Sequence, residues 1–180
     1  MPNWCSTTYK IVGDDKSVNQ LFKDLKLAFN KSEWICDFVE YIGYDPKKYS
    51  LRGTFVDMRL EEGVLTIFQE TAWSELAHFR DILHDKYPNL EIYYREEECG
   101  LDVYGHNDHT GLYFPEQYVI DCDCDGLEYY DTLEDAIEAV KDITGNNNIT
   151  TEKEMFKAIN EYSESMDVCY SIHRFEIYDD

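Results

Sequence analysis

Residues 53–70 read G-T-F-V-D-M-R-L-E-E-G-V-L-T-I-F-Q-E, and this stretch decides the fold. Thr54, Val56 and Met58 alternate with the residues between them, which is the two-residue period of a β-strand. Residues 64–70 form a second such run, and Glu61-Glu62-Gly63 places a glycine at the turn between the runs. The pattern predicts a β-hairpin.

The flanking segments extend this hairpin into a larger unit. Residues 5–12 are rich in threonine, tyrosine, isoleucine and valine and end at Gly13, as a strand does, and residues 90–95 read as another strand. Apolar residues at helical spacing predict a helix after each of two serines, Ser17 and Ser74, which we expect as the N-caps. Residues 30–49 predict a short helix or a packed loop.

The resulting order is β-α-(α)-β-β-α-β, the split βαβ or ferredoxin-like arrangement. We therefore predict an α+β fold in which an antiparallel sheet carries helices on one face and leaves the other face open.

The C-terminal part predicts a β-hairpin and helix extension. Strands are expected at 101–104, 117–124, 127–130 and 169–178, with a turn at Asp125-Gly126. Thr132 and Gly145 bound one predicted helix, and the Thr151-x-x-Glu154 capping box begins another. We divide the chain into a ferredoxin-like domain at 1–125 and an acidic α/β extension at 126–180, packed on it and not independent.

Negative charge is concentrated in the second half of the chain. The protein carries 38 acidic and 16 basic residues, a net charge of -22. Residues 1–89 hold 14 acids and 11 bases, whereas residues 90–180 hold 24 acids and 5 bases. Such a field disfavours nucleic acid and anionic membranes as partners and favours a basic protein surface. Ordinary solvated acidity explains the same composition.

No segment of the sequence suggests a leader or a membrane span, so we expect a cytoplasmic protein. The six cysteines form no C-x-x-C pair, and we expect them to be reduced thiols. Nothing in the sequence calls for a cofactor.

An acidic segment resembles the start of a calcium-binding loop. Asp121, Asp123 and Asp125 occupy the first, third and fifth positions of an EF-hand pattern, followed by Gly126. The pattern then fails, because the eighth position is Glu128 and the twelfth is Thr132. The alternative is a hairpin with exposed acids. We name five acidic candidates for binding a partner: Asp121, Asp123, Asp125, Glu128 and Asp131.

A second candidate site lies at residues 106–109, where His106, Asp108 and His109 offer imidazole and carboxylate ligands for a metal. The alternatives are a metal-dependent hydrolase and a plain polar loop. No serine or cysteine lies in a nucleophile motif, so no catalytic residue is assigned.

The open sheet face suggests two further alternatives, an RNA-binding module and a homodimer that pairs through its sheet. RNA-binding sheets use stacked aromatic residues with a basic background. Phe55, Phe68, Tyr93 and Tyr94 supply aromatic rings near the expected strands, but few basic residues accompany them.

Several short motifs resemble the YubB/Api92-like ferredoxin-like family of phage, plasmid and bacterial proteins. They are Asn3-Trp4-Cys5, the F-Q-E-T-A-W-S run from Phe68, and Glu97-Glu98-Cys99-Gly100. The resemblance spans about residues 1–125 and implies a ferredoxin-like shape with no established activity. We expect structural roles for Asn3, Trp4, Cys5 and Trp73: Trp4 closing one end of the sheet, Asn3 tying down the terminus, and Trp73 in the core.

These observations favour a cytosolic binding or interaction module over an enzyme. The module would serve as an accessory protein of a mobile element and engage a basic host protein.

Overall fold

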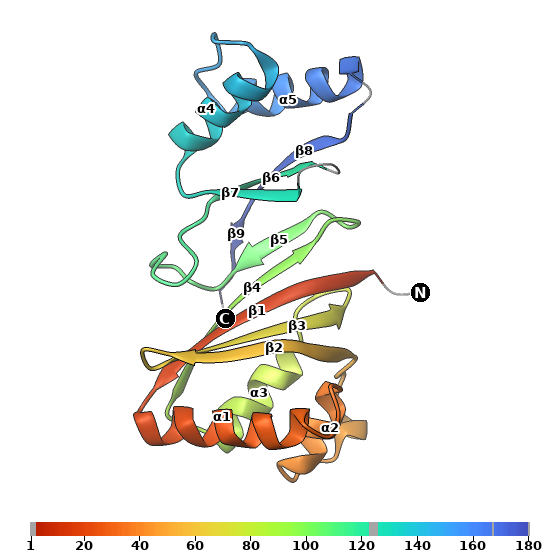
Figure 1. The fold of residues 1–180 in the computed structure, drawn as a ribbon, viewed down its shortest axis with the longest axis vertical. Helices are drawn as coiled ribbons and strands as arrows, with labels where there is room; N and C mark the ends of the chain where they lie inside the picture. Colours follow the sequence, from red (N-terminus) through yellow and green to blue (C-terminus); the bar gives the residue numbers. More distant parts are fainter. Residues whose placement is uncertain (1–2, 123–125, 167, 180) are drawn as a thin grey trace. The chain divides into compact units, whose positions relative to one another are not determined.

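The computed structural model describes residues 3–122, 126–166 and 168–179. The chain forms two compact units (Figure 1). Residues 1–108 together with 178–180 make the N-terminal unit, and residues 109–177 make the C-terminal unit. The protein combines helices and strands in both units, so the α+β class is confirmed.

Five antiparallel strands in the order β2-β3-β1-β4-β5 form the sheet of the N-terminal unit. They are β1 (Trp4–Gly13), β2 (Gly53–Glu61), β3 (Val64–Ala72), β4 (Leu90–Glu98) and β5 (Val103–His106). The predicted hairpin is β2–β3, with a register shift between Phe55 and Asp57. Cys5, Thr7 and Tyr9 on β1 are buried, and the residues between them are more exposed, which defines two faces of the sheet.

The helices of this unit lie on one side of the sheet (Figure 1). They are α1 (Asp15–Phe29), α2 (Ile35–Tyr41) and α3 (Ala77–Lys86), with a short 3-10 helix at Pro46–Lys48. Phe79 of α3 is at the centre of the core, because its ring meets those of Tyr9, Phe38 and Phe55 edge-on at 5.6, 6.1 and 5.9 Å. The side that carries these helices is called the helix face below, and the other side the open face.

Two predicted helix caps are wrong. The N-cap of α1 is Asp14, whose carboxylate accepts the Ser17 N–H at 3.0 Å and the Ser17 hydroxyl at 2.7 Å. Helix α3 begins after Leu76 without a side-chain cap. Ser74 does not cap it, because its hydroxyl donates to the Glu75 carbonyl and its own carbonyl accepts from Thr71.

The C-terminal unit packs two helices on one side of a three-stranded antiparallel sheet of order β7-β6-β8 (Figure 1). Its elements are β6 (Tyr118–Cys122), β7 (Gly126–Tyr130), α4 (Leu133–Thr144), α5 (Glu152–Met166), β8 (Tyr170–Arg174) and β9 (Glu176–Ile177). The predicted caps of these helices are confirmed: Thr132 accepts the Asp135 N–H, Gly145 is left-handed, and Thr151 and Glu154 bond reciprocally.

The division between the units falls at 108/109, whereas the sequence placed it at 125/126. Strand β6 is flanked by β7 and β8, so it belongs with the C-terminal elements. The last residues return to the N-terminal unit, where the Tyr178 N–H donates to the His106 carbonyl at 2.9 Å. In the described part of the chain, no helix has the length and apolar character that crossing a membrane requires.

Candidate functional site

The motifs behind the family resemblance meet at one end of the N-terminal sheet. Trp4 is opposite Ala72, and the Trp73 N–H donates to the Asn3 carbonyl at 3.0 Å. The Glu98 carboxylate accepts the N–H groups of Gly100 and Leu101 at 2.8 and 2.7 Å. A side chain on Gly100 would lie 2.6 Å from the Asn3 amide nitrogen and 2.9 Å from Glu98 Oε1, so Gly100 lets these two side chains approach the backbone closely. Segments that are distant in the sequence thus build one local structure.

Beneath this end, on the helix face, is a group of buried polar side chains that we call the polar cluster. Its members are Cys5, Thr7, Gln69, Thr71, Glu75 and Glu96, together with Tyr9 and Arg80. Polar groups in an interior are stable only when they are hydrogen-bonded, so the partners of each member decide what the cluster does.

Glu75 is the centre of the polar cluster. Its carboxylate accepts the Tyr9 hydroxyl at 2.6 Å and the Arg80 Nε–H at 3.0 Å, and its backbone N–H donates to Glu96 Oε2 at 2.6 Å. Burial raises the pKa of Glu75, and the charge of Glu96 adds to the rise, whereas Arg80 and Tyr9 oppose it. Arg80 also lies 4.4 Å above the ring of Tyr94. These contacts fix the start of α3 to the sheet.

The polar cluster also holds Trp73 in an unusual backbone conformation. Trp73 has a φ of 78°, in the left-handed region that a bulky side chain rarely adopts. Such a residue costs about 1–2 kcal/mol. The Thr71 hydroxyl donates to the Ser74 carbonyl at 2.7 Å, and Glu96 binds the next N–H, so the chain on the C-terminal side of Trp73 is fixed. The arrangement positions the residues around the tryptophan.

Cys5 has no nucleophilic character in this setting. Burial raises the pKa of its thiol to about 11, and the nearby charge of Glu96 adds to the rise. The thiol is therefore protonated at neutral pH. Its predicted place in a buried strand agrees with its complete burial.

The three tryptophans of the chain are all about half exposed, at 44% for Trp4, 45% for Trp34 and 48% for Trp73. The expectation that Trp73 lies in the core is wrong, because the turn after β3 directs it out of the interior. Trp4 is on the open face, since the buried side chains of β1 are at odd positions. Exposed aromatic side chains that gather on one surface mark interaction sites. The sequence indicated which strand, turn or loop each tryptophan belongs to, but it did not predict that their side chains are exposed.

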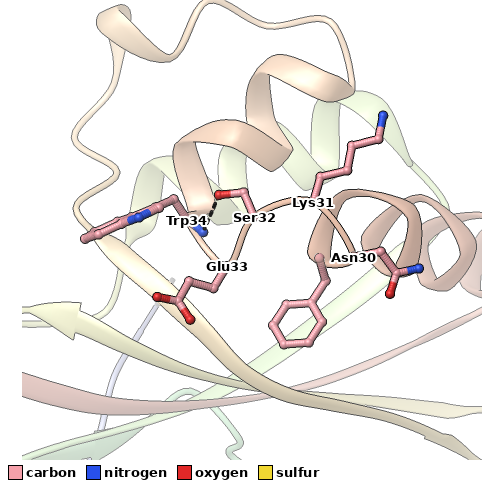
Figure 2. Close-up of a pocket in the computed structure, with 6 residues that line it drawn as sticks. Asn30, Lys31, Ser32, Glu33 and Trp34 are labelled. Atoms are coloured by element: carbon pink, nitrogen blue, oxygen red, sulfur yellow. Dashed lines mark hydrogen bonds between the residues drawn. The ribbon is translucent and has the colours of Figure 1, made fainter.

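A separate shallow hollow of about 420 Å³ lies between α1 and α2, lined by residues 29–34. Figure 2 shows the Trp34 indole extending away from Asn30 and Lys31. The Ser32 hydroxyl accepts the Trp34 N–H at 3.2 Å and donates to Asp37, so it serves to begin α2. The lining brings together no set of groups suited to acid–base or nucleophilic chemistry.

The structure places the predicted metal ligands in different environments. His106 and Asp108 are buried, and His109 is exposed. His106 Nδ1 accepts the Asp108 N–H at 3.2 Å. Among the described residues, no group of three or more histidine, cysteine, aspartate and glutamate side chains could hold a metal ion.

Three of the acidic candidates lie on or next to strands β6 and β7. Asp121 is on β6 and partly buried, whereas Glu128 and Asp131 are exposed. Asp123 and Asp125 lie outside the described residues. Glu128 accepts the Tyr130 hydroxyl at 2.6 Å, and burial together with this bond raises the pKa of Tyr130.

A larger acidic surface than the hairpin lies on α4, and it was not predicted from the sequence. Glu134, Asp135, Glu138 and Asp142 are all exposed on α4, whereas Ala136, Ile137 and Val140 of the same helix are buried. Asp131 lies just before the helix, and together with these four residues it forms what is called the acidic face below. Their spacing of three, four and seven residues is visible in the sequence and could have identified it.

The aromatic residues proposed for RNA binding divide between the two faces of the sheet. Phe55 and Tyr94 are buried on the helix face, and Phe68 and Tyr93 are on the open face. Three nearby groups have an acidic neighbour: Arg59 pairs with Asp57 at 2.9 Å, Arg95 with Glu97 at 3.1 Å, and Tyr93 donates to Glu91 at 3.1 Å. This pairing reduces the positive potential that phosphate binding requires.

Comparison with known proteins assigns no family. No protein-family model matches the chain, and no curated protein matches it. Among solved structures, the chain is similar to a crystal structure described as an unknown protein from Galdieria sulphuraria, at 10% identity over 94% of this chain and 97% of that chain. The TM-score of 0.29 is too low to carry an argument about fold or function.

Proposed function

We propose that the protein is a non-enzymatic interaction module of the cytoplasm whose N-terminal unit is a ferredoxin-like domain of the YubB/Api92-like family. The strand order β2-β3-β1-β4, with antiparallel neighbours and helices on one side, supports the ferredoxin-like shape. The meeting of the Asn-Trp-Cys, Thr-Ala-Trp and Glu-Glu-x-Gly motifs at one end of that sheet supports the family.

The partner in this proposal is a basic surface on another protein, and the acidic face of α4 is the observation that carries it. Its acids are exposed on the side of the helix away from Ala136, Ile137 and Val140. Lys141, the only basic residue of α4, is bound to Glu138 at 2.7 Å. The face therefore presents an excess of negative charge to an incoming partner.

The local energetics of α4 agree with a role in binding. Glu134, Glu138 and Asp142 follow one another at intervals of four residues, where like charges destabilise a helix by a few tenths of a kcal/mol per pair, roughly 0.2–0.5. Asp135 has a local role, because its N–H and carboxylate bond Thr132 at the N-cap. Glu134 also lies in the first turn, where the helix dipole favours a carboxylate, whereas Glu138 and Asp142 lie beyond it. A cationic partner would relieve the repulsion among the three. An accessory protein of a mobile element could engage a basic host protein in this way.

Calorimetry with a synthetic peptide of lysine, arginine and glycine tests the proposal. The triple variant Glu134→Gln, Glu138→Gln, Asp142→Asn removes three charges from the acidic face. The matched control Glu40→Gln, Glu61→Gln, Glu62→Gln removes three exposed charges from the N-terminal unit.

We expect the wild type and the control to bind the peptide with an affinity that falls steeply between about 0.05 and 0.5 M salt. The α4 variant should bind more weakly, and a peptide with glutamate at each basic position should not bind. Equal affinity of the α4 variant and the control would remove the acidic face from the proposal.

A further inference from the structure

Two half-exposed tryptophans and a glutamate share the open face at one end of the N-terminal sheet. Glu70 on β3 is directly opposite Ser6 on β1 and Thr54 on β2. Trp34 forms an isolated antiparallel bridge with Thr54, and Trp4 is opposite Ala72. Directly opposite residues of antiparallel strands place their side chains on the same face. Trp34 and Trp4 therefore stand on either side of Glu70.

The surface between the tryptophans is formed by small side chains and is accessible to solvent. Ser6, Thr54 and Ala72 have small side chains, and none of them is buried. Glu70 is exposed, and in the described part of the chain its carboxylate has no hydrogen bond or ion pair. The site is thus a carboxylate that forms no ion pair with the described residues, on a floor of small residues between two indole rings. Arg52, which is exposed and whose carbonyl accepts the Ala72 N–H at 3.0 Å, is a neighbouring cation that does not pair with it. We call Trp4, Trp34 and Glu70 the indole–carboxylate site.

Indole rings and a carboxylate favour the same kind of ligand. The face of an indole attracts a lysine ammonium or an arginine guanidinium, and a carboxylate pairs with either. An anionic ligand would be repelled by Glu70, and a purely apolar one would leave its charge without a partner. A second copy of this chain is disfavoured, because it would bring another net charge of -22 to the same surface.

We propose that the indole–carboxylate site binds a lysine or arginine side chain of a basic polypeptide. The inference rests on the proposed function in that both involve a basic partner, but it uses residues of the other unit. The indole–carboxylate site would be a second point of contact for the basic partner. It would select a cationic side chain through contact with the indole rings as well as through charge.

Tryptophan fluorescence and calorimetry with the lysine, arginine and glycine peptide test the site. The variant Trp73→Phe leaves Trp4 and Trp34 as the remaining tryptophans of the chain, so its emission reports on the site alone. The test variants are Glu70→Gln, Trp4→Ala and Trp34→Ala. The matched controls are Glu62→Gln, which removes an exposed charge at the β2–β3 turn, and Trp73→Phe itself. Trp4→Phe keeps an aromatic ring if Trp4→Ala does not fold.

We expect the peptide to change the emission of the Trp73→Phe protein, and each test variant to bind about 2- to 5-fold more weakly than the controls. Trp4→Phe should lie between the wild type and Trp4→Ala. Unchanged affinity of Glu70→Gln and of the Trp4 variants would overturn the inference.

The α4 triple variant separates this inference from the proposed function. If the α4 variant loses binding while Glu70→Gln keeps it, the acidic face is supported and the indole–carboxylate site is overturned. If Glu70→Gln loses binding while the α4 variant keeps it, the site is supported and the acidic face fails. Absence of binding by the wild type at low salt would overturn both.

Discussion

Gln69 places an amide in the interior of the N-terminal unit without a partner. It is 1% exposed, and neither its Oε1 nor its Nε2 has a hydrogen-bond partner among the described residues. It is opposite Thr7 and Phe55 in the sheet. A buried amide that makes no hydrogen bond costs about 1–3 kcal/mol. This residue is the weakest point of the polar cluster.

The variant Gln69→Met should therefore be more stable than the wild type by about 1–2 kcal/mol, because an apolar side chain of similar length replaces the unpaired amide. Urea unfolding measures the change. The exposed Gln117→Met serves as the control and should change the free energy of unfolding by less than about 0.5 kcal/mol. A loss of stability in Gln69→Met would mean that the amide is hydrogen-bonded in solution.

The polar cluster could not be predicted from the sequence, and the reason is separation along the chain. Cys5, Gln69, Glu75 and Glu96 come from three strands and a turn. Nothing local shows that their side chains point to the same interior. The exposure of Trp73 was likewise hidden, because it depends on a left-handed residue held by contacts with distant segments.

At the scale of elements, the sequence predicted features that depend on neighbouring residues, but not those that depend on residues far apart in the chain. The β2–β3 hairpin, the Thr132 and Gly145 ends of α4 and the Thr151–Glu154 capping box follow from residues within one turn of each other, and all are confirmed. The unit boundary depends on how β6 pairs with β8, which is distant in the sequence. Ser74 as a helix cap failed because α3 begins two residues later, after Leu76, and the polar groups of Ser74 bond Glu75 and Thr71 instead.

The capping box of α5 predicts a pH dependence. Glu154 accepts N–H groups from Thr150 and Thr151, and these bonds lower its pKa below the usual 4.5. A carboxyl whose folded-state pKa is lowered adds stability above its unfolded pKa, and this stability is lost as pH falls through the folded value. Glu154→Gln should thus have a lower urea midpoint than the wild type at about pH 7, and the difference should shrink at acid pH, as the pH falls through the lowered folded-state pKa.

Glu164→Gln, an exposed site on the same helix, provides the control and should show no such difference at either pH. A pH-independent difference for Glu154→Gln would show that the carboxylate charge does not contribute to the cap.

The return of the chain end to the N-terminal unit predicts a steric coupling. A side chain at Gly105 would lie 2.3 Å from Cζ of Tyr178, whose ring stacks on Tyr94 at 6.3 Å. Gly105→Ala should lower the free energy of unfolding by about 1–3 kcal/mol. Adding Tyr178→Ala should recover part of that loss, with a coupling above about 0.5 kcal/mol. Strictly additive effects would place the Tyr178 ring elsewhere.

At the scale of the whole molecule, the net charge of -22 is the dominant property. Mutual repulsion among like charges destabilises a compact state, and salt screens it. Raising the salt from about 0.05 to 0.5 M should therefore raise the melting temperature. The α4 triple variant should show a smaller rise in melting temperature than the matched control. The three charges that it removes are close together on one helix, so their removal relieves more repulsion than the removal of the three control charges. A melting temperature that is independent of salt would contradict this account of the acidic surface.

The most direct test of the central claim is to map peptide contacts by NMR. The amide signals of the uniformly ¹⁵N-labelled protein are followed as the lysine, arginine and glycine peptide is added at low salt. The account predicts shifts concentrated in the amides of residues 131–142 and in the indole N–H signals of Trp4 and Trp34, with the β2–β3 turn unchanged. An unchanged spectrum, or shifts that avoid α4, would contradict a module that binds a basic surface through its acidic face.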